Sequence, residues 1–298
     1  MSDFRLEVFY TVAKRLSFTK AAEELYITQP AVTKHIRELE QQYNNKLFDR
    51  NGNKIRLTPA GAILLSHAED LFTIYRAIEF DMNALLQKHK GLLNLGASTT
   101  ISQYLIAPIL AGFKKKFEEI ELKLITGNTA QIEKALIDKE IELGIVEGRS
   151  KNQEISYSDF LKDEIVLVCN KNHALAKANE INPSSLKAYR FIIREQGSGT
   201  RQVIDHALKD VGLSISDLPV EIQLGNTESI KSYLMHSNAL AFLSIHAINK
   251  ELLSGDLRII DVKDLNITRN FYFTHLQGKP DPLAEKLIRF AKLHYNLK

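Results

Sequence analysis

The stretch SFTKAAEELYITQPAVTKHIR, residues 17–37, constrains the fold of this chain more than any other segment. It holds two helix-start signals close together, because Ser17 or Thr19 suits the cap of one helix and Thr28 suits the cap of the next. Pro30 is tolerated in the first turn of that later helix. The stretch therefore predicts a helical corner, joined to an earlier helix by a short connection.

The later helix of this corner presents polar and basic groups on one face. Val32, Ile36 and Leu39 recur at helical spacing and predict a buried stripe, which leaves the other face to solvent. Amides and hydroxyls can bond base edges, and basic side chains hold phosphates or read guanine. An ordinary capped surface helix is the alternative. The residues that we expect to contact DNA are Thr28, Gln29, Pro30, Thr33, Lys34, Arg37, Arg50 and Lys54.

The segment LFDRNGNKIRLTPAG, residues 47–61, supports the DNA-binding interpretation. Its NGN turn and the strand-like KIRLT predict a β-hairpin wing, with Arg50 and Lys54 placed to contact the DNA backbone or minor groove. Residues 1–58 hold 10 Lys and Arg against 7 Asp and Glu, whereas residues 59–298 hold 29 of each. The whole positive excess therefore lies in the part that the motifs assign to a polyanionic partner.

The stretch from Phe4 to Gly61 resembles the LysR-type family of bacterial transcriptional regulators. The resemblance rests on F-x-x-V-A at 9–13, SFTKAAEEL at 17–25, TQPAVTKHIRELE at 28–40, LFDR at 47–50 and RLTPAG at 56–61. Asn53 departs from the arginine that many relatives have at the wing tip. The resemblance implies a winged helix-turn-helix domain, residues 1–58, that binds double-stranded promoter DNA. RNA polymerase is a candidate further partner.

Residues 59–89 are expected to form a long linker helix. Its apolar positions have the heptad spacing of a coiled-coil seam, which predicts pairing with a second chain as a dimer or within a tetramer. Dimerisation also suits DNA reading, because one recognition helix contacts too few base pairs. An amphipathic helix packed on its own domain is the alternative. The seam positions are Leu64, Ala68, Leu71, Tyr75, Ile78, Met82 and Leu85.

After Lys90 the pattern becomes α/β, with strands separated by helical segments, which favours parallel βαβ units. The resemblance implies that residues 90–298 form an effector-binding domain like the periplasmic binding proteins. Its first subdomain would comprise 91–161 and 267–298, and its second 162–266. The strand candidates are residues 92–97, 122–126, 143–146, 165–168, 191–194, 220–224, 239–243 and 270–273.

Hydroxyl side chains follow several of these strands, where open α/β sheets bind ligands. Hydroxyl donors near helix starts favour an anionic ligand, such as a carboxylate or an oxyanion. The alternative is that serine and threonine simply cap the helices that follow the strands. By the resemblance, the candidate effector-binding residues are Ser98, Thr99, Thr100, Thr129, Ser198 and Thr200.

Two other classes of protein compete with this interpretation: an enzyme, and an α/β small-molecule-binding protein without DNA function. GSGTRQ lacks the third glycine of a dinucleotide fingerprint. Cys169 and His173 lie four residues apart, but Cys169 ends an apolar strand and is expected to be a packing residue. No metal-ligand spacing and no cofactor motif stand out. The N-terminus lacks an export signal and no apolar run approaches about 18 residues, so a cytoplasmic protein without membrane contact is expected.

Overall fold

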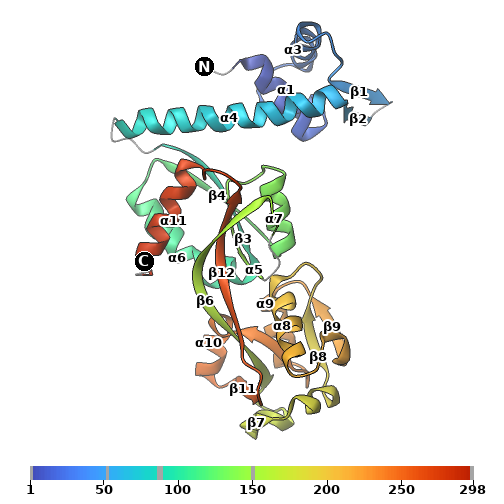
Figure 1. Cartoon of the computed structure of the whole chain (residues 1–298), viewed down its shortest axis with the longest axis vertical. Helices are drawn as coiled ribbons and strands as arrows, with labels where there is room; N and C mark the ends of the chain where they lie inside the picture. Colours follow the sequence, from blue (N-terminus) through green and yellow to red (C-terminus); the bar gives the residue numbers. More distant parts are fainter. Residues whose placement is uncertain (1–2, 52–53, 86–89, 149–151, 296–298) are drawn as a thin grey trace. The chain divides into compact units, whose positions relative to one another are not determined.

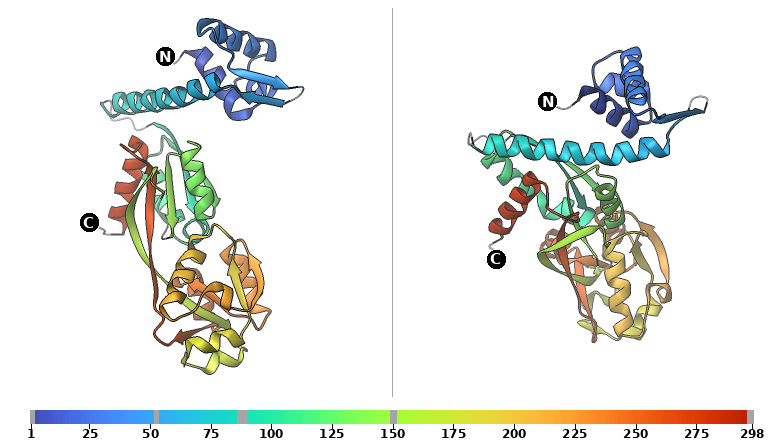
Figure 2. Two further views of the ribbon diagram at one scale, coloured as in Figure 1. Left: turned by 45° about the vertical axis from the view of Figure 1, so that its right-hand side comes forward. Right: turned by 45° about the horizontal axis from the view of Figure 1, so that its top comes forward.

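In the computed structural model the chain forms two compact units, residues 1–88 and 89–298. Figures 1 and 2 show a mostly helical first unit and a second unit in which helices surround a long sheet. The structure describes residues 3–51, 54–85, 90–148 and 152–295.

The first unit begins with three helices: α1 (Phe4–Arg15), α2 (Phe18–Glu24) and α3 (Gln29–Gln42). The side chain of Ser17 accepts a hydrogen bond from the Lys20 amide and caps α2. Thr28 accepts one from the Ala31 amide at 3.4 Å and caps α3, whose first turn contains Pro30. The helical corner predicted for residues 17–37 is therefore confirmed, and local capping explains where its helices begin.

The apolar faces of these helices form one core, and the two strands of the wing pack against it. Strands β1 (Phe48–Asn51) and β2 (Lys54–Leu57) pair antiparallel, as the wing prediction requires. Residues 52–53 lie outside the described residues, and so does the departure at Asn53. The core residues include Phe9, Val12, Ala21, Ala22, Val32, Ile36, Leu39 and Leu47.

Helix α4 (Pro59–Leu85) belongs to the first unit. It begins close to the wing, because a Cβ added to Gly61 would lie only 2.1 Å from the carbonyl oxygen of Leu47. Ala68 is fully buried in the core of this unit, and Leu64 packs against the same core. The first two seam positions therefore serve the helix's own domain, as the alternative interpretation requires, and pairing with a second chain stays a prediction for the later positions.

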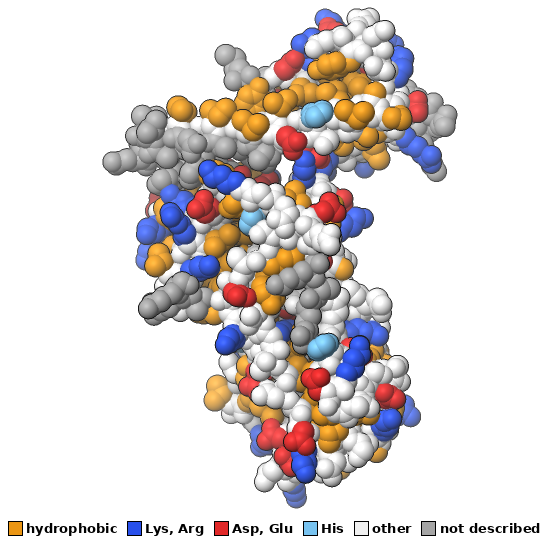
Figure 3. All heavy atoms as spheres, viewed as in Figure 1, with side chains coloured by type: hydrophobic (Ala, Val, Ile, Leu, Met, Phe, Trp, Pro, Cys, Tyr) orange, Lys and Arg blue, Asp and Glu red, His pale blue; other side chains and the backbone are white. Residues whose placement is uncertain are grey.

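The remainder of the α4 seam presents apolar side chains to solvent. Leu71, Tyr75, Ile78 and Met82 are exposed, with Ile78 and Met82 at 50% and 57%. Figure 3 shows hydrophobic side chains in a row along this helix. The side chain of Leu85 lies outside what the structure describes. This exposed row is the part of α4 that is available to a partner.

The second unit is built on one long mixed sheet with strand order β4-β3-β5-β12-β6-β11-β7, and β10 also pairs with β6. Parallel pairing is confirmed between β3 and β4 and between β3 and β5, but β5–β12, β6–β12, β6–β10 and β6–β11 are antiparallel. The strands are β3 (Gly91–Ser98), β4 (Ile120–Gly127), β5 (Leu143–Glu147), β6 (Ile155–Asn170), β7 (Glu180–Ile181), β10 (Ala241–Ser244), β11 (Leu257–Val262) and β12 (Ile267–Leu276).

Two lobes share the long strands β6 and β12, which run from one lobe to the other in Figure 1. The first lobe holds β3–β5 with α5 (Thr99–Tyr104), α6 (Ile106–Lys116), α7 (Thr129–Ile137) and α11 (Pro282–His294). The second holds the parallel pair β8 (Phe191–Arg194) and β9 (Val220–Leu224), α8 (Gly199–Asp210), α9 (Thr227–Met235) and α10 (Ile245–Ser254). The ends of β3 and β5 and the start of α8 meet where the lobes adjoin.

Candidate functional site

Helix α3 presents the polar face that the sequence predicts. Gln29, Lys34 and Arg37 are exposed, and Thr33 is half-buried. The Gln29 amide donates to the Thr33 hydroxyl at 3.2 Å, so the two side chains are held side by side. Such a pair presents donors and acceptors that suit base edges in a major groove.

The remaining predicted DNA contacts divide into two groups. Thr28 and Pro30 are exposed, but the structure explains them first as the cap and first turn of α3. Arg50 and Lys54 lie on the paired wing strands, and their side chains are outside what the structure describes. The structure therefore brings Gln29, Thr33, Lys34 and Arg37 together on one helix.

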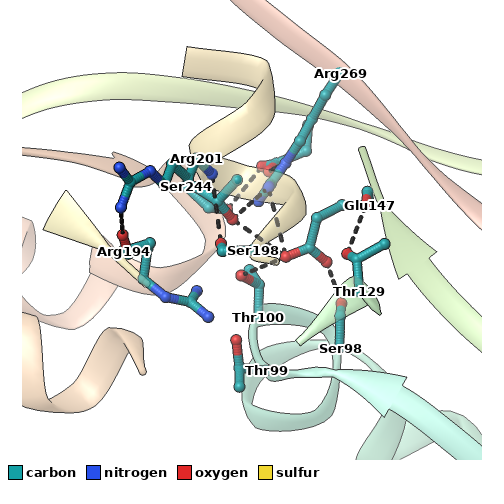
Figure 4. A network of polar contacts seen from close by, with 12 residues as sticks. Ser98, Thr99, Thr100, Thr129, Glu147, Arg194, Ser198, Arg201, Ser244 and Arg269 are labelled. Carbon is teal, nitrogen blue, oxygen red and sulfur yellow. Dashed lines mark hydrogen bonds and ion pairs between the residues drawn. The ribbon is translucent and has the colours of Figure 1, made fainter. Parts of the chain in front are cut away.

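In the second unit, the hydroxyls predicted to bind an effector surround a carboxylate of the chain itself. Glu147 ends β5 and is only 2% exposed. Its carboxylate accepts hydrogen bonds from Ser98, from Thr100 at 3.5 Å and from Thr200 at 3.1 Å. Figure 4 shows Ser98 and Thr100 directed at the Glu147 carboxylate, and Thr200 reaches it from the second lobe. The predicted residues do meet, but an internal anion occupies the place between them.

Arg269, on β12, extends this network. Its Nη1 donates to the Thr200 hydroxyl at 2.7 Å and lies 3.7 Å from the Glu147 carboxylate. Its Nε donates to Asp163 at 2.7 Å, and Ser244 donates to the other oxygen of Asp163 at 2.7 Å. Since Arg269 and Asp163 are both buried, each needs the other's charge to remain there.

A backbone hydrogen bond joins the two lobes on one side of this network, where the Ala130 amide donates to the Gly197 carbonyl at 3.2 Å. Within the first lobe, the Thr129 hydroxyl donates to the Glu147 carbonyl oxygen at 2.6 Å. A Cβ added to Gly199 would lie 2.0 Å from that same Glu147 oxygen, so only glycine permits this approach. Ser198 accepts from the Arg201 amide as the cap of α8, the alternative role for these hydroxyls.

Thr99 differs from the other predicted residues because its buried hydroxyl has no hydrogen-bond partner within the described part of the chain. Arg194, at the end of β8, also has one free buried nitrogen, Nη1, on the same basis. Its Nε and Nη2 bind Glu195 at 2.8 and 3.0 Å, and Nη2 also donates to the Gly225 carbonyl. In Figure 4 the Thr99 hydroxyl and the Arg194 guanidinium point toward one another.

The Arg194 guanidinium is fixed by its ion pair with Glu195. Burial would raise the pKa of Glu195, but the hydrogen bonds and charge of Arg194 outweigh burial, so the pKa lies below its ordinary value. Glu195 therefore stays ionised and orients the guanidinium. Buried donors without partners are the chemistry of an anion subsite.

Sequence reasoning missed Glu147, Asp163, Arg194 and Arg269 as members of this site. Glu147 and Arg194 are each the charged last residue of an otherwise apolar strand, and a charged residue at a strand end was a usable signal. Asp163 and Arg269 lie on strands β6 and β12, and only antiparallel pairing makes Arg269 the register partner of Asp163.

The pair Cys169 and His173, weighed as a catalytic couple, is structural. Cys169 is fully buried, and burial raises the pKa of its thiol to about 11, so little reactive thiolate forms at neutral pH. The His173 Nδ1 accepts the Leu175 amide at 3.0 Å and is engaged as a helix cap. Among the described residues, no helix is long and apolar enough to span a bilayer.

A head with an exposed recognition helix and a two-lobed domain with a buried polar site define a ligand-responsive DNA-binding regulator. Residues 4–62 match the model of the bacterial regulatory helix-turn-helix proteins of the LysR family, and residues 86–295 match the LysR substrate binding domain. The chain belongs to the LysR family of transcriptional regulators, with a DNA-binding domain and an effector-binding domain.

Curated proteins that match nearly the whole chain are transcriptional regulators. The HTH-type transcriptional regulator CysL of Bacillus subtilis (strain 168) is 30% identical over 270 residues, which cover 91% of this chain and 89% of CysL. A probable RuBisCO transcriptional regulator of Thalassiosira pseudonana is 32% identical over 272 residues, covering 89% of this chain and 88% of the relative.

Solved structures show the same fold. The regulatory domain of CcmR from Synechocystis PCC6803, in complex with 2-PG, superposes with a TM-score of 0.61 at 27% identity, covering 69% of this chain and 97% of that domain. A full-length OxyR variant from Pseudomonas aeruginosa has a TM-score of 0.73 at 17% identity and covers 98% of this chain and 95% of its own. The OxyR likeness, at this identity, shows the fold alone.

Proposed function

We propose that this regulator senses a small anion through Thr99 and Arg194, and that binding there changes how its heads engage promoter DNA. The observation that supports the anion subsite is the pair of buried donors, Thr99 Oγ1 and Arg194 Nη1, that have no partner among the described residues. Buried donors without partners are costly, and a bound acceptor removes that cost. The complex of the CcmR regulatory domain with 2-PG supports a small ligand in a related domain.

The other predicted effector residues take supporting roles in this proposal. Ser98, Thr100 and Thr200 hold the Glu147 carboxylate, Thr129 holds its backbone oxygen, and Ser198 caps α8. They hold the strand end of β5 and the start of α8 in place, while Thr99 and Arg194 offer free donors. A ligand can act on DNA binding only if it prefers one arrangement of the lobes, and this site joins both.

DNA recognition is assigned to α3 and the wing. In the proposal, Gln29 and Thr33 read base edges, while Lys34, Arg37, Arg50 and Lys54 bind phosphates or the minor groove. The exposed apolar row on α4 pairs two chains, so that two heads bind two half-sites. We further propose a cytoplasmic protein that works with RNA polymerase and catalyses no reaction.

A binding experiment tests the DNA assignment. A site is selected from a random-sequence duplex library with the wild-type protein, and its affinity is compared with that of a scrambled duplex by fluorescence anisotropy. Gln29→Ala is expected to cost about 1–3 kcal/mol on the selected site and little on the scrambled one. Lys34→Ala is expected to weaken both and to reduce the salt dependence. Equal losses on both duplexes for Gln29→Ala would overturn the base-reading role.

The effector class is tested by a thermal-shift screen of the full chain against metabolite anions and neutral analogues. A ligand at about 100 times its dissociation constant adds about 2.7 kcal/mol of stability to the unit that binds it. Stabilisation by anions, and none by their neutral amides, is the expected result. Stabilisation by neutral compounds alone would refute the anion subsite.

A further inference from the structure

The Glu147 carboxylate sits in a complete anion-binding site. Its donors are Ser98 and Thr100 from the first lobe, Thr200 from the second, and the nearby Arg269 guanidinium from β12. Each of these side chains is buried, and Figure 4 shows Ser98, Thr100 and Arg269 beside the Glu147 carboxylate. Several donors that converge on one carboxylate are what a protein builds to bind a small acid.

The Glu147 carboxylate fills the space among the Ser98, Thr100 and Thr200 hydroxyls. The close approach at Gly199 closes the backbone side, where an added Cβ would lie 2.0 Å from the Glu147 oxygen. Asp163 also pairs with Arg269, at 2.7 Å. Two buried acids therefore share the Arg269 guanidinium, whose Nη2 is the one buried nitrogen of this side chain without a partner among the described residues.

We propose that Glu147 is a built-in ligand, whose carboxylate fills the anion subsite made by Ser98, Thr100, Thr200 and Arg269. It links the two lobes and reserves that subsite, so that an effector's acid group is directed elsewhere in the cleft. This inference rests on the proposed function only in placing that acid group at Thr99 and Arg194. The vacated subsite of a Glu147 variant would itself be a receptor for a small carboxylate.

Glu147→Ala tests this directly, because it removes the carboxylate and one methylene, which together have the heavy atoms of acetate. We expect acetate to raise the melting temperature of the full-length variant in a saturable way and to restore it toward the wild-type value. Acetate should bind the variant at least about tenfold more tightly than the wild type, since one hydrogen bond to a charged acceptor corresponds to about that factor. Acetamide and chloride should not substitute for acetate.

Glu133→Ala is the matched control. Glu133 is a half-buried carboxylate on α7 that accepts from the Tyr157 hydroxyl at 2.7 Å, outside the network around Glu147. Its variant is expected to lose stability without acetate-specific recovery. Glu147→Gln keeps the shape of the side chain and fills the subsite, so it is expected to fold and to gain no acetate site.

The outcomes separate cleanly. Equal acetate responses in Glu147→Ala, Glu133→Ala and the wild type would overturn the built-in ligand. If Glu147→Ala folds only when acetate is present, the proposal is supported; if it fails to fold with acetate while Glu147→Gln folds, the proposal is overturned. Since this experiment uses neither DNA nor effector, its failure leaves the proposed function standing. Failure of the anion screen would likewise leave the acetate result intact.

Discussion

Gly199→Ala adds one methyl group where the two lobes of the effector-binding domain meet. The new Cβ would lie 2.0 Å from the Glu147 carbonyl oxygen and 2.5 Å from the Thr129 hydroxyl. Ordinary carbon–oxygen contacts are about 3.3–3.6 Å, so the lobes have to separate by roughly 1.3 Å or more. Glu147 is the last residue of β5, between β3 and β12 in the sheet, so its carbonyl cannot move alone.

The cost follows from what this separation strains. Overpacking of an interior costs about 1–3 kcal/mol, and the Thr129 and Thr200 hydrogen bonds to Glu147 add about 0.5–1.5 kcal/mol each if they break. A total of about 2–6 kcal/mol lowers the melting temperature of a unit of this size by roughly 4–24 °C. The variant should also release the lobes from one another and change its effector response.

Differential scanning calorimetry of the full-length protein measures the effect on the transition of the effector-binding unit. Gly225→Ala is the control, because a Cβ there meets no atom within 4 Å. We expect a large decrease for Gly199→Ala and a small change for Gly225→Ala. A Gly199→Ala protein that melts with the wild type would show that the lobes do not meet as described.

Two further predictions concern the linker helix and acid stability. Leu71→Glu and Ile78→Glu are expected to shift the protein toward monomers in sedimentation, because a charge cannot be buried in an apolar pairing face. Ser66→Glu, at another exposed position of the helix, is the control. Burial lowers the pKa of His173, so the unfolded chain takes up its proton near pH 6.5 while the folded chain resists it. Stability is therefore full above that pH and is lost as pH falls, by up to about 1.4 kcal/mol per pH unit.

Replacement of His173 by asparagine keeps an acceptor for the Leu175 amide and removes the proton linkage. Its melting temperature should fall less steeply between pH 7 and pH 5 than that of the wild type. An unchanged slope would rule out His173 as a source of acid sensitivity. For helix α4, intact assembly of both Leu71→Glu and Ile78→Glu in sedimentation would place the main pairing surface outside the α4 seam.

The head could be predicted from the sequence because its signals are local. Ser17 and Thr28 cap the helices that directly follow them, and the turn between β1 and β2 joins neighbouring segments. Even so, the heptad spacing of α4 could not show that Ala68 packs into the head while Ile78 faces solvent. Periodicity identifies an apolar face, but burial depends on what lies opposite.

For the effector-binding domain, the sequence predicted most of the strands but not how those strands pair. Apolar runs such as β5, which is buried throughout, were visible, whereas the first half of β6 is mostly half-buried or exposed and was missed. Strand β11 was missed as well, since half of its residues are polar or partly exposed. Antiparallel pairing across β6 and β12 joins distant segments, and no local pattern encodes it.

The same limit applies to the site. Residues 98–100 and 200 were placed together by strand-end reasoning, which the structure supports in geometry. The sequence could not show that Glu147, about 50 positions from either group, fills the space between them. Nor could it distinguish Thr99, whose hydroxyl is free, from Thr100, whose hydroxyl is bonded.

Titration calorimetry of Thr99→Val with an anion from the thermal-shift screen tests the central claim most directly. The Thr99 hydroxyl has no partner among the described residues, so its isosteric replacement should leave the melting temperature unchanged or raised. Thr129→Val, which removes a 2.6 Å bond to Glu147, should instead lower stability and spare ligand affinity. Thr99→Val is expected to weaken anion binding about 10- to 100-fold. Wild-type affinity in a stable Thr99→Val protein would contradict it.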